Sequence, residues 1–198
     1  MSLISLVAEA PLFWRRSAPT GDALVDALQR GELAAIGMAY DLHHTAVRAF
    51  ARRLTGDRDA AEDLVQEVFV TLATAGRKFD GRCALRTFLI GIAINHARHH
   101  VRSAARRRKM WLTAADGRAE HEQAADAAAA QAELARLLSQ ALDALPIDQR
   151  VAFVLCEVEE RSAAEAAEIA GAPEATMRTR LFHARKKLRE ALERSEVR

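Results

Sequence analysis

AEDLVQEVF, residues 61–69, is the stretch that decides the fold of the first half of the chain. Its spacing predicts a helix with one apolar side, which consists of Ala61, Leu64, Val65, Val68, Phe69 and Leu72. The opposite side is polar except at one position and consists of Asp63, Gln66, Glu67 and Val70. A valine among two carboxylates and an amide fits a solvated face with one stray apolar residue. It also fits a surface for a protein partner.

The composition favours an all-helical protein. The chain has 198 residues, which is enough for one domain or two small ones. Nine glycines and four prolines leave few breaks for many short strands, and alanine dominates the apolar residues. The formal net charge is only +2, so the molecule as a whole is not a polycation. A surface that binds nucleic acid would therefore require the basic residues to be concentrated in one part of the chain.

Residues 1–20 form an extension before the first predicted helix. Its short apolar run precedes the basic pair Arg15 and Arg16, which is the reverse of the order in a secretory signal. An amphipathic membrane contact through Phe13 and Trp14 stays an alternative for this segment. No apolar run in the chain approaches the roughly 20 residues that a membrane span needs. We therefore expect a cytoplasmic protein without a membrane span.

The sequence contains no set of residues typical of an enzyme. It has no Ser/His/Asp set, no glycine-rich phosphate loop and no paired buried carboxylates, so we expect neither catalysis nor a cofactor. Three histidines cluster at His96, His99 and His100, but the only further metal ligand in prospect is Cys83, so we expect no metal site. Cys83 and Cys156 have no metal-type spacing and are expected to be free core or loop thiols.

The apolar periodicity and the breaks predict two compact halves joined by a linker. In the first half we expect helices over 21–30, 32–54, 59–75 and 85–108. In the second half we expect helices over 134–145, 148–159, 163–170 and 174–194. Residues 113–133 carry five acids and no large aliphatic side chain, so they are expected to be a flexible linker. The predicted division is therefore 1–20, 21–112, 113–133 and 134–198.

Three details of these helices can be checked directly. Asp59 and Glu62 lie three residues apart and predict a capping box at the start of the 59–75 helix. The second helix is expected to bury Ile36, Met38, Tyr40, Leu42, Val47, Phe50 and Leu54. The helix over 148–159 is expected to bury Val151, Val154, Leu155 and Val158.

The long helix over 85–108 changes from apolar to basic after Ile94. One stripe of its surface consists of Asn95, Arg98, His99, Arg102, Arg106 and Lys109, with Phe88 at the upstream end. Arginines hold phosphates, whereas an amide or an aromatic ring can contact an exposed base. The stripe predicts nucleic-acid binding; the alternative is a solvated basic end of a helix.

The end of the chain predicts a helix-turn-helix. Ser162 and Glu165 form a capping box, and the sequence at 171–173 is a tight break between two helices. The second of these helices has a core face of Met177, Leu181, Ala184, Leu188 and Leu192. Its outer arc holds Arg178, Thr179, Phe182, His183, Arg185, Lys186 and Arg189. Such an arc suits major-groove recognition, in which Phe182 would contact thymine methyl groups. A helical hairpin with a charged outside is the alternative.

Four motifs in this order resemble a bacterial alternative sigma factor of the extracytoplasmic-function group (group IV), the minimal two-domain form of the housekeeping-sigma family. They are RRLTGDRDAAEDLVQEVF (52–69), RTFLIGIAINHAR with a trailing RRR (86–108), ALPIDQRVAFVL (144–155) and TMRTRLFHARKKLRE (176–190). The resemblance covers residues 22–194. It implies a protein that binds core RNA polymerase and opens promoter DNA, and that is commonly held inactive by an anti-sigma protein.

The resemblance also implies roles for individual residues. The face of Asp63, Gln66 and Glu67, with Val70 at its centre, would dock on the coiled coil of the large clamp subunit of polymerase. The loop 79–85 and the following helix would melt the minus-ten promoter element. Asn95 and the arginines after it would then face the non-template strand. The last helix would read the minus-thirty-five element. The acidic linker would occupy the polymerase channel toward the RNA exit.

Three positions depart from the family pattern. Phe88 stands where tryptophan is usual, Gly91 stands where arginine is usual, and His183 often corresponds to an arginine. Histidine is mostly uncharged near neutral pH, so it holds phosphate or guanine less firmly. Two other classes of function stay open from the sequence: a helix-turn-helix regulator that binds duplex DNA without polymerase, and an adaptor anchored through residues 1–20.

Overall fold

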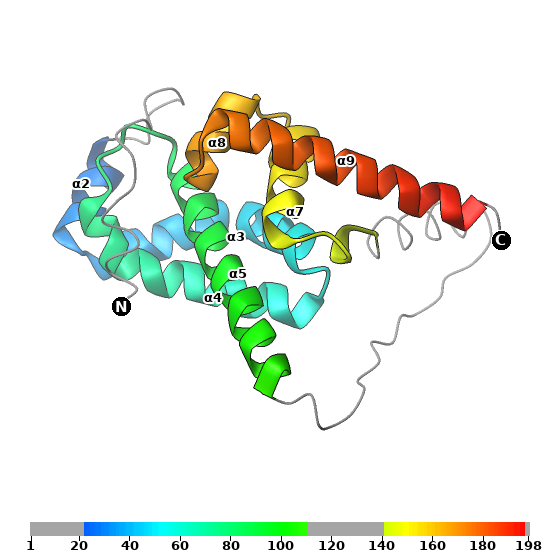
Figure 1. Ribbon diagram of the computed structural model, residues 1–198. Coiled ribbons are helices and arrows are strands. Elements are labelled where there is room, and N and C mark those ends of the chain that lie inside the picture. The colour runs from blue at the N-terminus through cyan, green and yellow to red at the C-terminus, as the bar shows by residue number, and fades with distance from the viewer. Residues whose placement is uncertain (1–21, 111–140, 197–198) are drawn as a thin grey trace, which may run out of the picture.

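The structure, a computed structural model, describes residues 22–110 and 141–196 (Figure 1). Every regular element in these two ranges is helical, which confirms the predicted all-α class. In order they are α2 (Asp22–Arg30), α3 (Leu33–Thr55), α4 (Arg58–Ala75), the 3₁₀ turn η1 (Gly76–Lys78), α5 (Leu85–Met110), α7 (Ile147–Phe153), the π-helical turn η2 (Val154–Val158), α8 (Ala163–Ala170) and α9 (Glu174–Glu196). No described helix is both long enough and apolar enough to cross a bilayer. The predicted extension and the predicted linker lie outside the described residues.

Helix α4 has the apolar side that its spacing predicts. All six predicted residues, from Ala61 to Leu72, are buried in the core of the molecule. The start of the helix differs from the prediction, because Asp57 caps it and Asp59 lies within its first turn. The Asp57 side chain accepts a hydrogen bond of 2.7 Å from the Ala60 amide. Gly56 ends α3 in a left-handed conformation (φ 70°), so the next residue is already placed to cap α4. Glu62 instead pairs with Arg48 of α3.

Replacing Asp57 with alanine should therefore lower the free energy of unfolding by about 1 kcal/mol, because the amide of Ala60 loses its acceptor. The matched change Asp59→Ala removes the same carboxylate two residues later. It should cost a few tenths of a kcal/mol through the helix dipole alone. Urea unfolding of the two variants measures the difference. Equal losses would show that Asp57 does not act as the cap.

Helix α3 packs through small residues as well as large ones. Val47, Phe50 and Leu54 are buried as predicted, but the prediction was wrong for three residues near the start of the helix: Met38, Tyr40 and Leu42 are 55%, 39% and 65% exposed. The buried positions near the start of α3 are alanines instead, namely Ala35 and Ala39. Alanine lets two helix backbones approach closely, and α3 packs extensively against α4 and α5. The neighbouring helices therefore determine which face of α3 is buried.

The segment after Pro146 is helical but not continuous. Helix α7 ends at Phe153, and η2 continues it with π-helical hydrogen bonding. The wider π turn shifts the phase of the side chains that follow. Val151, Val154 and Leu155 are buried as predicted, whereas the prediction was wrong for Val158, which is 41% exposed.

The predicted helix-turn-helix is present as α8 and α9. Ser162 and Glu165 form the reciprocal capping box at the start of α8, and Gly171 ends that helix with φ 60°. Met177, Leu181, Ala184 and Leu188 of α9 are buried as predicted. The Leu192 side chain lies outside the described part of the structure.

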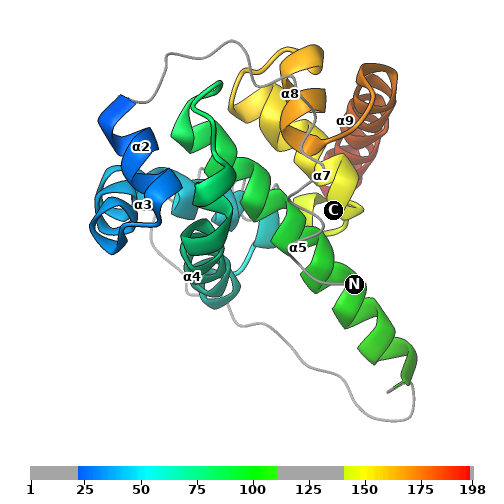
Figure 2. The same ribbon diagram turned by 90° about the vertical axis from the view of Figure 1, so that its left-hand side faces the viewer.

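The two halves of the chain pack against each other and share one hydrophobic core (Figure 2). That core runs from Val25 to Ala97 in the first half and from Val151 to Leu181 in the second. Helices α7 and α8 both lie against α5. A smaller cluster of Ala141, Leu145, Ala184 and Leu188 joins α9 to the segment before Pro146. The structure is therefore a closed arrangement of the two halves.

Both cysteines are free thiols, as the sequence predicts. Cys83 is buried beside the start of α5, and burial raises its pKa to about 12. Cys156 is half-buried, and burial also raises its pKa. A raised pKa lowers the fraction of thiolate, which is the reactive form of a cysteine.

Candidate functional site

The polar side of α4 forms a surface that the other described residues leave open. Asp63 and Gln66 are exposed, and Val70 is 73% exposed, the most exposed large apolar residue of α4. The Glu67 side chain is 39% exposed. The structure therefore places all four predicted polymerase-contact residues on one face, and we call these four residues the α4 face.

A hollow of about 550 Å³ lies between the α4 face and α5. The four residues of the α4 face line it together with Thr71, and three histidines of α5 complete the wall: His96, His99 and His100. No group of histidine, cysteine and carboxylate side chains in the described ranges has the geometry of a metal site. The histidines instead meet the acidic face predicted for a protein partner.

Glu67 is held by two of these histidines. His100 Nε2 lies 2.7 Å from Glu67 Oε2 and 2.9 Å from Oε1, and His96 Nδ1 lies 3.1 Å from Oε2. The other nitrogen of His96 lies 2.8 Å from the Thr71 hydroxyl oxygen. Burial lowers the pKa of His96, and the Glu67 carboxylate offsets part of this effect. His96 Nδ1 is thus within ion-pair distance of the carboxylate, whereas the hydrogen bonds of this group are those of His100 with Glu67 and of His96 Nε2 with Thr71.

The basic stripe predicted on α5 does not form one surface in this arrangement. Phe88 is buried and packs against Phe79, with ring centroids 4.9 Å apart. Asn95 is half-buried, and His99 is exposed in the hollow beside α4. The Arg98 side chain is only 15% exposed and points to the second half of the chain. The side chains of Arg102 and Arg106 lie outside the described part, so the role of the stripe stays a prediction.

The outer arc of α9 is open as predicted. Its candidate base-contacting residues are all exposed: Arg178, Thr179, Phe182, His183 and Lys186. The Phe182 ring is 64% exposed and touches only the His183 ring among the aromatic contacts of the described residues. Arg178 pairs with Glu174 one turn earlier on the same helix. These side chains are held only by their own helix, so they can reorient toward a ligand.

Two acids of the second half bind arginines of the first half. Glu159, which directly follows the π turn, pairs with Arg53 of α3 at 2.9 Å and with Arg86 of α5. Asp148 of α7 pairs with Arg98 at 2.8 Å and with Arg180 of α9 at 2.9 Å. Arg98 also donates a hydrogen bond of 2.8 Å to the Ala170 carbonyl. In the closed arrangement, Arg98 is therefore bound to the second half of the chain, although the sequence predicts that it contacts DNA.

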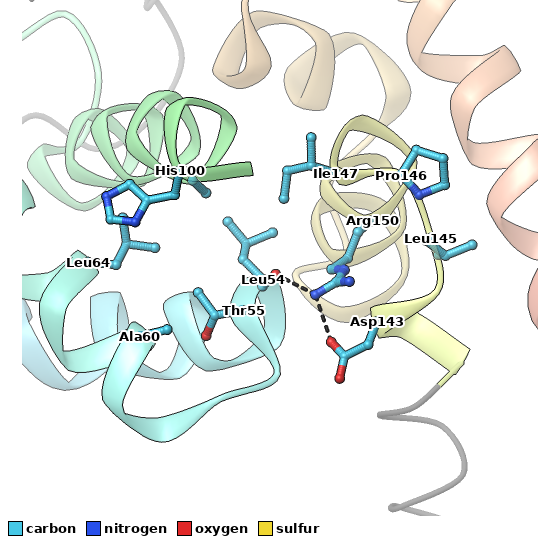
Figure 3. Close-up of a pocket in the computed structure, with 11 residues that line it drawn as sticks. Leu54, Thr55, Ala60, Leu64, His100, Asp143, Leu145, Pro146, Ile147 and Arg150 are labelled. Carbon is cyan, nitrogen blue, oxygen red and sulfur yellow. Dashed lines mark hydrogen bonds and ion pairs between the residues drawn. The ribbon is translucent and has the colours of Figure 1, made fainter. Parts of the chain in front are cut away.

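Arg150, an arginine of the second half, also contributes to this interface (Figure 3). Arg150 of α7 is buried and donates hydrogen bonds to the Leu54 carbonyl at 2.6 Å and to the Asp143 carboxylate at 2.8 Å. Burial lowers the pKa of Arg150, and Asp143 offsets part of the change. A cavity of about 390 Å³ beside it is lined by both halves. A Cβ on Gly56 would meet the Asp143 carboxylate, and the left-handed conformation of Gly56 also favours glycine at this close approach.

These contacts between the halves were not predicted from the sequence. The paired residues lie 50 to 106 positions apart, and Glu159 and Asp148 look like ordinary solvated acids in the sequence. The roles of His96 and His100 were not predicted either. Their four-residue spacing on α5, on the side next to Glu67, is the only signal that would have indicated a shared function.

Comparison with known proteins finds two segments of the chain that match family models. Residues 39–107 match sigma-70 region 2, and residues 135–188 match sigma-70 region 4. The chain is 30% identical over 178 residues to the RNA polymerase sigma-H factor of Pseudomonas aeruginosa, covering 86% of this chain and 92% of that protein. It is 28% identical over 174 residues to the ECF RNA polymerase sigma-E factor of Haemophilus influenzae, covering 84% and 92%.

Two solved structures are similar to most of the chain. One is the sigma factor RpoE in complex with the anti-sigma factor NepR from Bartonella quintana, with a TM-score of 0.62 and 27% identity. It covers 79% of this chain and 96% of that chain. The other is CnrH in complex with the cytosolic domain of CnrY, with a TM-score of 0.58 and 25% identity over 86% and 96% of the two chains.

Proposed function

Because the chain belongs to the extracytoplasmic-function (ECF) group of the sigma-70 family, we propose that it is an alternative sigma factor, which binds core RNA polymerase and directs it to specific promoters. One observation carries this proposal: an open acidic face on α4 and an open basic arc on α9 occur in one chain, within the segments that match regions 2 and 4. The presence of both regions in a chain of 198 residues supports its placement in group IV.

The proposed mechanism divides the work between the two halves. The α4 face binds polymerase, and the arc of α9 contacts the minus-thirty-five element in the major groove. Helix α5 and the loop before it melt the minus-ten element. Capturing a flipped base in a protein pocket offsets the few kcal/mol that its unstacking costs. None of these steps makes or breaks a covalent bond, so the protein acts as a specificity subunit and not as an enzyme. Its proposed place of action is the bacterial cytoplasm, where polymerase and promoter DNA are found.

The closed arrangement has to open for this mechanism. Promoter elements centred near positions minus ten and minus thirty-five lie about 25 base pairs apart, which is about 85 Å of B-form DNA at 3.4 Å per base pair. Helices α5 and α8 are in contact in the structure. The chain between Met110 and Ala141 has 30 residues and can reach about 100 Å when extended. We therefore infer that the closed arrangement belongs to the free protein.

The decisive experiment is reconstituted transcription with purified core polymerase on candidate promoters. The proposal predicts association with core and specific transcripts that core alone does not make. A protein that does neither, but binds duplex DNA tightly as a dimer, would instead be a helix-turn-helix regulator acting alone. That result would leave the α4 face without a role.

Arg178→Ala tests the reading of the upstream element. We expect a loss of about 1–3 kcal/mol in binding of holoenzyme to a promoter with the preferred minus-thirty-five sequence, because Arg178 stands at the start of the exposed arc. The control Arg194→Ala removes an exposed arginine near the far end of the same helix and should have little effect. An equal loss on every upstream sequence would show that Arg178 only holds phosphate.

An anti-sigma protein is the proposed regulatory partner. The two similar structures are complexes with the anti-sigma factor NepR and with the cytosolic domain of CnrY. We propose that a protein of this kind keeps the present chain inactive by covering the faces that contact polymerase or DNA. Co-purification of such a partner with the full chain, and its competition with core polymerase, would support the proposal.

A further inference from the structure

We propose that His96 and His100 are positioning residues of the polymerase-docking surface, which hold Glu67 so that the hollow between α4 and α5 receives a cationic side chain of the partner. This inference rests on the proposed function, in which the α4 face docks on polymerase. It changes the assignment of this part of α5. The sequence analysis treated these histidines only as candidate metal ligands and placed the neighbouring His99 in the DNA stripe.

Both oxygens of Glu67 are engaged from α5. His100 contacts the two oxygens at 2.9 and 2.7 Å, and His96 contacts Oε2 at 3.1 Å. His96 is itself held, because its second nitrogen meets the Thr71 hydroxyl at 2.8 Å. The His96 side chain is only 13% exposed, so its orientation is fixed by packing as well. Glu67 is therefore held at the base of the hollow from two sides.

Fixing the carboxylate before the partner arrives makes binding tighter. A free glutamate on a helix surface samples many rotamers, and a partner that binds it has to immobilise it. Here the two histidines have already restricted the side chain. A carboxylate offers about four lone-pair positions, so Glu67 can still accept a hydrogen bond from a partner. Its side chain remains 39% exposed on the open side.

The charge of the hollow selects a cationic partner group. Asp63 and Glu67 are one turn apart on the same face, and no lysine or arginine is among the described residues that line the hollow. Val70, next to them, offers an apolar contact. An arginine or lysine fits this combination, because its aliphatic stem can lie on the valine while its charged head meets the carboxylates.

The same contacts also connect the proposed polymerase-docking surface with α5, the helix that is proposed to face DNA. His96 and His100 lie on α5 on either side of Arg98, whereas Glu67 lies on α4. A partner that binds Glu67 therefore acts on the orientation of α5 through the hydrogen bonds of His100 and the close contact of His96.

The test measures the affinity of the full-length protein for purified core polymerase. We expect His100→Ala to weaken binding about fivefold, which corresponds to about 1 kcal/mol. His100→Gln keeps a side-chain N–H donor and should restore affinity to within about twofold of the unchanged protein. The control His44→Ala removes an imidazole from α3 that bonds only within its own helix among the described contacts, and it should have no effect.

A double-mutant cycle separates positioning from a structural role. If His100 acts through Glu67, then Glu67→Gln should cost clearly less in the His100→Ala background than in the unchanged protein. Additive losses would overturn the proposal. Unchanged or tighter binding of His100→Ala would also overturn it, because the histidine would then be neutral or would compete with the partner for Glu67.

The failure of this inference can be told apart from the failure of the proposed function. If reversing the charges of Asp63 and Glu67 leaves core binding unchanged, the docking assignment of the α4 face is itself wrong. If that reversal weakens binding but the histidine variants do not, only the positioning role fails.

Discussion

The change of both Asp63 and Glu67 to lysine is expected to weaken binding to core polymerase about 100-fold, which corresponds to about 2.7 kcal/mol. Each substitution replaces an attractive charge at the proposed interface with a repulsive one, and like charges placed against each other at an interface cost several kcal/mol. Asp63 is exposed and Glu67 is partly exposed, so the buried side of α4 stays unchanged. The fold should therefore survive.

Equilibrium binding to labelled core polymerase measures this effect, and the far-ultraviolet circular dichroism of the variant checks the fold. The matched control is Asp26→Lys with Asp41→Lys, which makes the same change of charge at exposed positions on α2 and α3. A similar loss in the control would mean that the total charge of the protein, and not the α4 face, governs association. Full affinity in the Asp63 and Glu67 variant would contradict the docking assignment.

Opening of the closed arrangement is the second large effect that we expect. Glu159→Lys places a cation against Arg53 and Arg86, and Asp148→Asn weakens the bond to Arg98 while keeping an acceptor for Arg180. The Glu159 side chain is only 9% exposed, although both of its arginine partners are about 40% exposed. With that exposure taken into account, the two changes together should destabilise the closed form by about 3 kcal/mol. The ratio of open to closed molecules would then rise more than 100-fold.

Small-angle X-ray scattering measures this opening in the free protein. A compact chain of this length has a radius of gyration of about 16 Å, and separation of the halves on a flexible linker should raise it above about 20 Å. The variant should also bind core polymerase more tightly, because a binding-competent form that is rarely populated lowers the apparent affinity. This gain would distinguish opening from simple loss of stability.

The control for the opening experiment makes the same change of charge within the second half alone. Glu157 pairs with Arg185 of α9, and Glu190 pairs with Lys186 of the same helix. Glu157→Lys with Glu190→Gln should therefore leave the radius of gyration unchanged. If the Glu159 and Asp148 variant stays as compact as the control, the apolar contacts alone hold the halves together and the ion pairs do not act as a latch.

The parts of the structure that the sequence predicted are those set by local spacing. Helix α4 has the predicted buried side and the predicted open face, and α9 has both predicted faces. The capping box of Ser162 and Glu165 also formed as predicted, since both partners lie within one turn. A helix repeats every 3.6 residues, so the identity of nearby residues is enough to separate an apolar side from a polar one.

The errors arose where a neighbouring element decides between alternatives that the spacing allows. The sequence permits Met38 and Leu42 to be buried, but Ala35 and Ala39 take the buried positions near the start of α3. It permits Asp59 to cap α4, but the left-handed Gly56 places the cap at Asp57. It permits a regular helix to Glu159, but the π turn changes the phase and exposes Val158.

The sequence by itself determined where most of the helices lie, the buried sides of α4 and α9, and the two faces that we propose contact polymerase and DNA, because each of these depends on residues less than a few turns apart. Only the tertiary structure decided that the two halves close on each other through Glu159, Asp148 and Arg150, and that His96 and His100 hold Glu67. Helical periodicity indicates which side of a helix is buried. It carries no information on which distant helix covers that side. Apart from the bond between Arg150 and Asp143, every one of these contacts joins residues at least 29 positions apart.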